Sequence, residues 1–145
     1  TPAHVLAGVT AYCPNSLATA EDVAAVQSLL TSFGTTVELE ESQLDAASAI
    51  GGSSPAYVYM FIEALADAGV AEGLKRPQAY QLAAQGVLGA AKLVLESGRH
   101  PGQLKDEVCS PSGSTIRGLE VLEKGAFRGT VIDALRTTIE KARAL

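Results

Sequence analysis

The spacing of hydrophobic positions predicts two strands and one helix at the start of the chain. Val5–Cys13 is largely apolar and is followed by a Pro-Asn-Ser turn, which predicts a strand. Over Glu21–Phe33 the apolar residues recur at helical spacing, and Gly34 ends that helix. Thr35–Leu39 is typical of a second short strand. This order describes a single βαβ unit, and parallel strands need further neighbours and covered faces to be stable.

After residue 40 the pattern becomes helical, so we predict a mainly α fold. We expect Gly51-Gly52 to end the first of these helices and Pro55 to open the second at its first residue. Gly73 to Pro77 separate the second helix from a long third one, which Gly98 closes. The predicted helices are Ser42–Ile50, Pro55–Ala71, a long helix to about Ser97, Pro101–Val108, Thr115–Glu123 and Phe127–Ala144.

Two of the predicted helices are apolar around most of their circumference. Tyr57–Val70 carries only two charges, and Tyr80–Leu95 has one narrow polar stripe. Such helices must be buried on most sides, and one chain of this length does not supply enough cover. We therefore expect a partner chain, most simply in a symmetric homodimer with interleaved helices. Charges interrupt both segments before the roughly 18 apolar residues of a membrane span accumulate, so we expect no membrane partner.

Composition excludes several classes of function. The chain has 145 residues, with 11 basic and 16 acidic side chains and a net charge of -5. It has no basic run, so we expect no nucleic-acid partner. Its two cysteines, Cys13 and Cys109, lack the spacing of metal ligands, so we expect no metal and a cytoplasmic location. We expect His4 and His100 to lie at the surface, and Cys109 to be a small packed residue rather than a reactive thiol.

A loop rich in serine precedes the fifth helix predicted after residue 40. Between Val108 and Thr115 the sequence reads Cys-Ser-Pro-Ser-Gly-Ser, which we call the serine loop (Cys109–Thr115). One interpretation is a capped turn with Ser112 or Ser114 as the N-cap. The other is an anion site, because the first amides of a helix are unpaired and its dipole favours negative charge there.

Four motifs in a fixed order indicate a family. They are Gly51–Val58 followed by Glu63–Val70; Ala84–Lys92; His100–Asp106; and the serine loop with Thr115, Gly118 and Leu119. Together they resemble the carboxy-terminal domain of pyrroline-5-carboxylate reductase, and the resemblance runs almost from end to end.

The resemblance implies an architecture. Residues 1–40 are similar to the last strand, helix and strand of the family's Rossmann nucleotide-binding domain. Residues 41–145 are similar to its helical domain for dimerisation and substrate binding. The sequence has no G-x-G-x-x-G, so most of the Rossmann domain is expected to be missing. The chain also begins without Met and without a signal peptide, so we expect it to be one part of a longer protein.

The resemblance also implies an activity. The family reduces the imine of pyrroline-5-carboxylate to L-proline in proline biosynthesis, with NADPH (or NADH) as the cofactor. We expect this chain alone to dimerise, to bind no cofactor and to be inactive; assembly beyond a dimer stays open. The alternatives are a non-catalytic helical dimerisation module, or a domain of a related imine or hydroxyacid reductase.

The same resemblance assigns roles to individual residues. Ser110, Gly113 and Ser114 are expected to hold the substrate, with amides near Gly113 and Ser114 meeting its carboxylate. Thr115 is the expected catalytic residue, whose hydroxyl reaches the ring nitrogen.

Two acidic residues have more open roles. Glu41 matches an acidic position near the substrate amine, although a first-turn helix acid explains it equally well. Glu107 stands where the family contacts the cofactor, often through an amide.

Two serines, Ser54 and Ser112, replace family glycines. Either serine would strain the backbone if its φ is positive.

Overall fold

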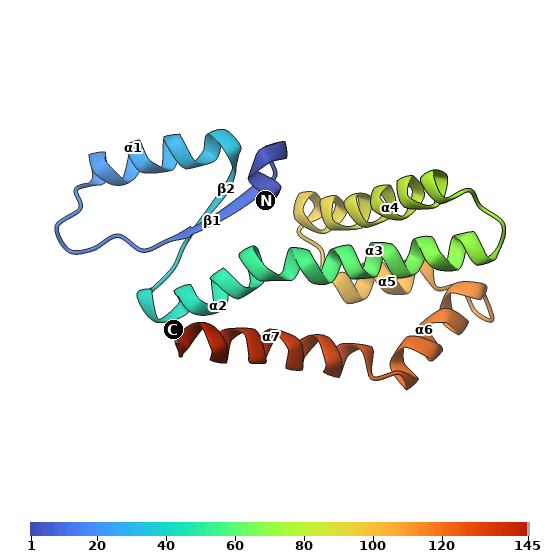
Figure 1. Ribbon diagram of the computed structural model, residues 1–145. Coiled ribbons are helices and arrows are strands. Elements are labelled where there is room, and N and C mark those ends of the chain that lie inside the picture. Colours follow the sequence, from blue (N-terminus) through green and yellow to red (C-terminus); the bar gives the residue numbers. More distant parts are fainter. Residues whose placement is uncertain (145) are drawn as a thin grey trace. The chain divides into compact units, whose positions relative to one another are not determined.

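The computed structural model describes residues 1–144 and is mainly helical, with one small sheet (Figure 1). The two strands are β1 (Gly8–Tyr12) and β2 (Gly34–Glu38). The α-helices are α1 (Ala20–Leu30), α2 (Leu44–Ser48), α3 (Ser54–Ala71), α4 (Arg76–Ser97), α5 (Pro101–Val108), α6 (Ser114–Lys124) and α7 (Phe127–Arg143). Short turns of other helix types are η1 (Pro2–Val5), η2 (Thr31–Phe33), η3 (Glu41–Gln43) and η4 (Ala49–Ser53).

The chain forms two compact units. One contains Thr1–Tyr57 with the chain from Ile132 onward, and the other contains Val58–Val131. The first unit holds the sheet, and the second holds α4, α5, α6 and most of α3.

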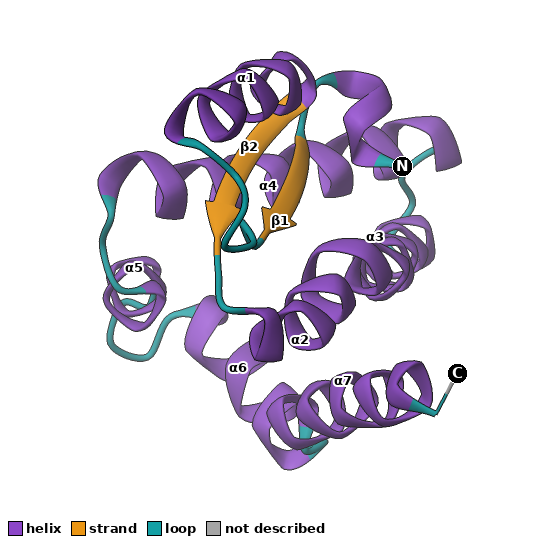
Figure 2. Ribbon diagram, turned by 90° about the vertical axis from the view of Figure 1, so that its left-hand side faces the viewer, coloured by secondary structure: helices purple, strands orange, loops and turns teal. Residues whose placement is uncertain are grey.

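The predicted βαβ unit is present in the first of these units. β1 and β2 pair in parallel, from Gly8 opposite Gly34 to Tyr12 opposite Glu38, with α1 alongside them (Figure 2). Tyr12 donates a hydrogen bond of 2.7 Å to Glu38, and Gln27 of α1 donates to the same Tyr12 hydroxyl. The mainly α fold class with a βαβ start is therefore confirmed. The first strand is shorter than predicted, because Val5 ends the turn η1 and Leu6 has a φ of 58°.

The predicted break at Gly51-Gly52 is wrong. The chain stays helical from α2 through η4 into α3, and η4 is a π-helical turn. Pro55 is therefore the second residue of α3 inside a continuous helical run, not the first residue of a new helix. A wider π turn accommodates the glycines without ending the helix.

The other predicted helices occur within a few residues of their expected bounds. Gly98 closes α4 with a φ of 61°, as a C-terminal glycine does. Thr19 caps α1 in a reciprocal hydrogen-bonded box with Asp22.

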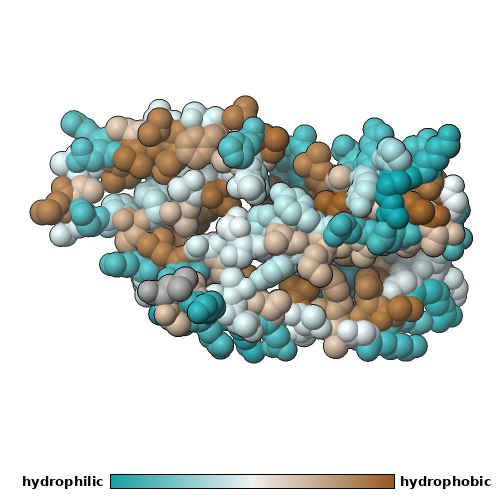
Figure 3. All heavy atoms as spheres, viewed as in Figure 1, coloured by the Kyte–Doolittle hydropathy of each residue, from teal (hydrophilic) through white to brown (hydrophobic). Residues whose placement is uncertain are grey.

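The buried core of the described residues is made of small side chains. The buried apolar residues are Ala49, Ala66, Ala79 and Ala83, and no large side chain among residues 1–144 is fully buried. Many large apolar side chains are exposed instead, and hydrophobic patches show at the surface over α1 and on the helices of the second unit (Figure 3). Within this stretch, no helix is long and apolar enough to cross a bilayer.

Candidate functional site

The serine loop folds into a tight turn. The Gly113 amide donates a hydrogen bond of 3.0 Å to the Ser110 carbonyl oxygen, which closes a four-residue turn. Pro111 occupies the second position, and Ser112 occupies the third with a φ of 61°. Proline followed by a positive φ is typical of a type II turn, whose third position favours glycine. Ser112 thus holds a backbone conformation that L residues rarely adopt.

The N-cap of α6 is Gly113, so the prediction of Ser112 or Ser114 in that position is wrong. An N-cap needs an extended backbone, and Gly113 has it, with φ -69° and ψ 168°. Ser112 is left-handed, and Ser114 is already the first helical residue. Gly113 carries no side chain, so this cap leaves the helix amides without a side-chain acceptor.

The first amides of α6 have no side-chain acceptor, unlike those of α1 and α5. This helix has no side-chain cap and no acidic residue in its first turn. By contrast, Thr19 and Asp22 cap α1, and the His100 ring caps α5. Since the first amides of an α-helix have no partner within the helix, those of Ser114 and Thr115 remain free to meet an anion.

A side chain at Gly113 would displace the Ser110 side chain and crowd the Ser110 carbonyl oxygen. A Cβ there would lie 2.3 Å from Ser110 Oγ and 3.1 Å from the Ser110 carbonyl oxygen. The loop therefore depends on glycine for close packing rather than for a positive φ. The side chains of Ser110, Ser114 and Thr115 are all exposed beside it.

Glu107 lies near the end of α5, three residues before Ser110. Arg99, next to the start of that helix, donates to Glu107 Oε1. This hydrogen bond and the guanidinium charge lower the pKa of the Glu107 carboxyl. In the part of the chain that the structure describes, no hydrogen bond reaches the other carboxylate oxygen, so it is available to a donor.

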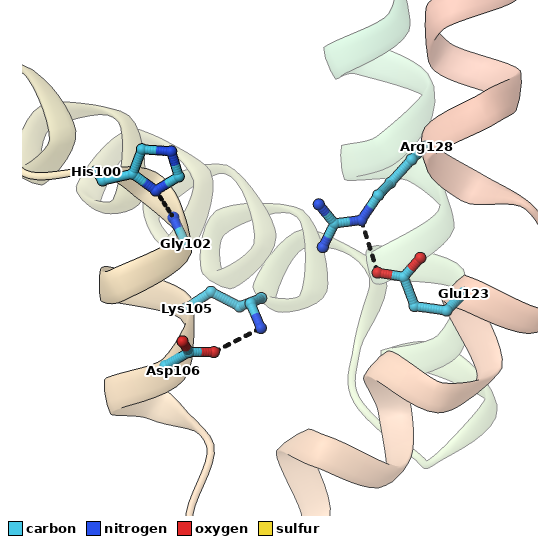
Figure 4. Close-up of polar contacts among 6 residues, drawn as sticks. All are labelled: His100, Gly102, Lys105, Asp106, Glu123 and Arg128. Atoms are coloured by element: carbon cyan, nitrogen blue, oxygen red, sulfur yellow. Dashed lines mark hydrogen bonds and ion pairs between the residues drawn. The ribbon is translucent and has the colours of Figure 1, made fainter.

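Further polar contacts organise α5 and the turn between α6 and α7 (Figure 4). His100 Nδ1 accepts a hydrogen bond of 3.0 Å from the Gly102 amide. The Lys105 ammonium lies 2.6 Å from Asp106, which raises the pKa of the lysine, and Arg128 pairs with Glu123 at 2.7 Å.

Sequence patterns alone did not reveal the capping role of His100 or the partner of Glu107. The Arg99–Glu107 pair spans eight residues, which matches no helical neighbour spacing. For His100, the one available signal is its position directly before Pro101, where a helix N-cap is common.

Glu41 belongs to the other compact unit. It opens the turn η3, which a reciprocal box between Glu40 and Gln43 caps, and its side chain is exposed. Most of the predicted site residues lie on one continuous stretch of the chain, from the end of α5 to the start of α6: Glu107, Ser110, Gly113, Ser114 and Thr115. Glu41 is the one that belongs to the other compact unit.

The cysteines and other metal-binding residue types form no cluster. Cys109 is half-buried at the end of α5, and Cys13 is exposed; neither is in a disulfide. Among residues 1–144, no group of three His, Cys, Asp or Glu side chains lies close enough to hold a metal ion.

Comparison with protein families and known proteins gives concordant matches. The family described as pyrroline-5-carboxylate reductase dimerisation matches residues 41–145. The pyrroline-5-carboxylate reductase of Escherichia coli is 51% identical over the whole chain, which covers 54% of that enzyme. The human pyrroline-5-carboxylate reductase 2 is 46% identical, again over the whole chain and 45% of the relative. The chain therefore spans about half the length of these curated relatives.

Solved structures of pyrroline-5-carboxylate reductases also match this chain over almost its whole length. The Coxiella burnetii pyrroline-5-carboxylate reductase superposes with a TM-score of 0.94 at 34% identity, over 99% of this chain and 54% of that one. A Plasmodium falciparum pyrroline carboxylate reductase, solved with NADP bound, gives 0.90 at 40% identity, over 99% of this chain and 58% of that one.

Proposed function

The chain belongs to the pyrroline-5-carboxylate reductase family through its dimerisation domain, and from this premise we propose that it is the carboxy-terminal part of such a reductase. The complete enzyme would reduce the C=N bond of pyrroline-5-carboxylate to give L-proline. Residues 1–40 would close the nucleotide-binding domain, and residues 41–145 would form the dimerisation and substrate domain. The family match over 41–145 supports this division.

The observation that carries the proposal is the open N-terminus of α6 behind the Ser110–Gly113 turn. A ring carboxylate is an anion of the right size for the free amides of Ser114 and Thr115, aided by the helix dipole. The Gly113 amide is already used within the turn. Gly113 would instead contribute the absence of a side chain, and the Ser110 hydroxyl would lie beside the carboxylate.

Thr115 would act on the reacting bond. Its hydroxyl stands on the first turn of α6, next to the proposed carboxylate site, and would donate a hydrogen bond to the ring nitrogen as that nitrogen becomes an amine. Glu41, if brought to the same substrate, would stabilise the positive charge of the iminium form. Both groups would orient the imine rather than transfer hydride.

The cofactor would be NADPH, or NADH, which supplies the hydride when bound. Glu107 is the residue of this chain that would contact it, and its free carboxylate oxygen fits a hydroxyl donor rather than a phosphate. The sequence contains no glycine-rich phosphate loop. We therefore propose that the chain alone binds no cofactor and has no reductase activity.

A homodimer would cover the exposed apolar surface. α3 and α4 line an open groove of about 540 Å³, walled by Phe61, Leu65, Leu82, Val87 and Val94 with small residues between them. Leu82 is 62% exposed and Phe61 37% exposed, although both belong to this groove. Packing against a second copy would remove these side chains from water.

Binding of L-proline by the purified chain tests the site. We expect Thr115→Ala to weaken proline binding by about tenfold, the usual effect of one lost hydrogen bond in a polar site. Calorimetry or NMR titration measures this, with Thr130→Ala, a threonine on α7 outside the loop, as the matched control. Unchanged proline affinity in Thr115→Ala would contradict the assignment, as would NADPH-dependent turnover by the 145-residue chain.

The second candidate is a non-catalytic dimerisation module, which the large exposed apolar surface favours. It predicts a stable dimer with no affinity for proline or a ring-carboxylate analogue. The same titration therefore separates the two functions.

A further inference from the structure

The strand β1 has one paired edge and one free edge. In the part of the chain that the structure describes, the sheet contains only β1 and β2, which lie side by side in Figure 2. The Leu39 amide donates to the Tyr12 carbonyl oxygen at 3.0 Å, so the backbone groups of Tyr12 face β2. Because these groups alternate in direction along a strand, those of Thr10 also face β2. The amides and carbonyls of Val9 and Ala11 therefore point to the free edge.

A groove follows this free edge. It has a volume of about 430 Å³ and is lined by four successive residues of β1, Gly8–Ala11, whereas no residue of β2 lines it. The side chains of successive strand residues point to opposite faces of a sheet. A groove lined by all four residues therefore runs along the edge of the strand rather than over one face.

The other walls of the groove leave the backbone of β1 within reach. One wall is Thr1–Ala3, and the other comes from α2 and η4. Except for Leu44, the residues of the second wall are small: Ala47, Ser48, Gly51 and Gly52. Small residues, glycine above all, are typical of places where another backbone approaches closely.

β1 carries none of the features that protect a strand edge from pairing. Its sequence is Gly-Val-Thr-Ala-Tyr, with no charged residue and no proline. Its register with β2 runs without a bulge from Gly8 to Tyr12. Exposed edges in proteins normally have lysine, proline or a bulge, because unpaired amides and carbonyls recruit further strands. An unprotected edge is typical of a strand that has a neighbour on both sides.

The length of the relatives indicates what covers this edge. The chain covers 54% of the Escherichia coli reductase and 54% of the Coxiella burnetii structure, so nearly half of a complete reductase is available to supply another strand. We propose that the groove seats one extended strand of the nucleotide-binding part, held by backbone hydrogen bonds to Val9 and Ala11, and that this strand binds even when that part is a separate chain. The inference rests on the proposed function, since only a part of a longer reductase has such a strand to receive.

Amide hydrogen exchange tests the pairing directly. The probe is the part of the Escherichia coli reductase that this chain does not match, co-expressed with the 145-residue chain as a separate, tagged polypeptide. We expect the Val9 and Ala11 amides to exchange about a hundredfold more slowly in the purified complex than in the chain alone. The Thr10 and Tyr12 amides face β2 and should be protected in both. Failure of the two parts to co-purify would overturn the proposal, as would a complex in which the Val9 and Ala11 amides stay unprotected.

Val9→Pro removes one amide from the free edge and leaves the groups that face β2 in place. Proline is tolerated at such edges, and Val9 is 49% exposed, so the variant should keep the circular dichroism of the unmodified chain. We expect its recovery with the tagged partner to fall about tenfold, the usual effect of one lost hydrogen bond. Val9→Ala, which loses the same side chain but keeps the amide, is the matched control and should co-purify normally. Equal recovery of the two variants would contradict the strand seat.

The free edge and the substrate site are tested by different measurements. Proline binding by the chain alone depends on the serine loop, and exchange of the Val9 and Ala11 amides depends on β1. Proline binding without strand pairing would contradict the strand seat alone, and pairing without proline binding would contradict the substrate site alone. Protection of the two amides that rises with the concentration of the chain alone would mean that a second copy covers the edge, which would also overturn the proposal.

Discussion

Two neighbouring residues of the serine loop, Ser112 and Gly113, have backbone conformations opposite to those usual for their residue types. Ser112 has a φ of 61°, whereas Gly113, the one glycine of the loop, has an ordinary φ of -69°. A left-handed backbone costs a residue with a Cβ about 1 kcal/mol relative to glycine. We therefore expect Ser112→Gly to raise the free energy of unfolding by up to about 1 kcal/mol, measured by urea denaturation. Ser114→Gly, in helical backbone, should lower it instead; a loss of stability in Ser112→Gly would show that the serine side chain has another role.

The two serines that replace family glycines, Ser54 and Ser112, differ in backbone conformation, which the sequence alone does not predict. Ser54 has a φ of -61°, so it bears no backbone strain, and its hydroxyl makes a hydrogen bond. Ser112 lies in the left-handed region. The departure from the glycines of the family pattern drew attention to both positions, but only the backbone angles distinguish the strained serine from the unstrained one.

Among the elements, α1 has the most complete cap and should respond to pH. The Asp22 carboxylate accepts from the Thr19 hydroxyl at 2.7 Å and from the Thr19 amide at 2.9 Å, and these bonds lower the Asp22 pKa. A group whose pKa is lower in the folded state stabilises the fold above its unfolded pKa, and this contribution disappears as pH falls through the folded pKa.

We therefore expect Asp22→Asn to lose stability at neutral pH and to approach the unmodified chain below about pH 4, where aspartate becomes protonated. Urea denaturation between pH 3 and 7 measures the difference. Glu21→Gln removes a charge from the same first turn without disturbing the box, so it should have a smaller effect. A difference between the Asp22 variant and the unmodified chain that stays constant with pH would argue against a role for the carboxylate charge.

Most helix bounds followed from apolar spacing and end residues, as in α4, α5 and α7. The junction of α2 and α3 did not, because Gly51-Gly52 and Pro55 are each typical of a helix boundary. The helix continues there because a π turn and the Ser54 hydroxyl replace the amide donor that Pro55 lacks, and Gly51 fits against Val9. Such compensation depends on contacts between segments, which local sequence patterns do not contain.

For the whole molecule, the exposed apolar side chains agree with the expectation of a partner chain, which stays a prediction. Apolar helices rich in alanine and glycine bury only small side chains, and large ones such as Leu82 and Leu88 stay exposed. The serine loop was found from its sequence because its residues are contiguous. The pairing of Arg99 with Glu107 depends on how α5 is oriented after Gly98, and no sequence period encodes it.

The exposed groove between α3 and α4 leads to a prediction on assembly. Leu82 lines the groove, so a carboxylate there would have to be buried without a partner in a dimer that covers it. We expect light scattering to give the unmodified chain twice its monomer mass, and Leu82→Asp to be monomeric at the same concentration. Leu17→Asp is the matched control, because Leu17 is 86% exposed, lies in the loop before α1 and is not one of the residues that line the groove. A Leu82→Asp chain that remains dimeric would place the interface on another surface, and helical circular dichroism in both variants separates dissociation from unfolding.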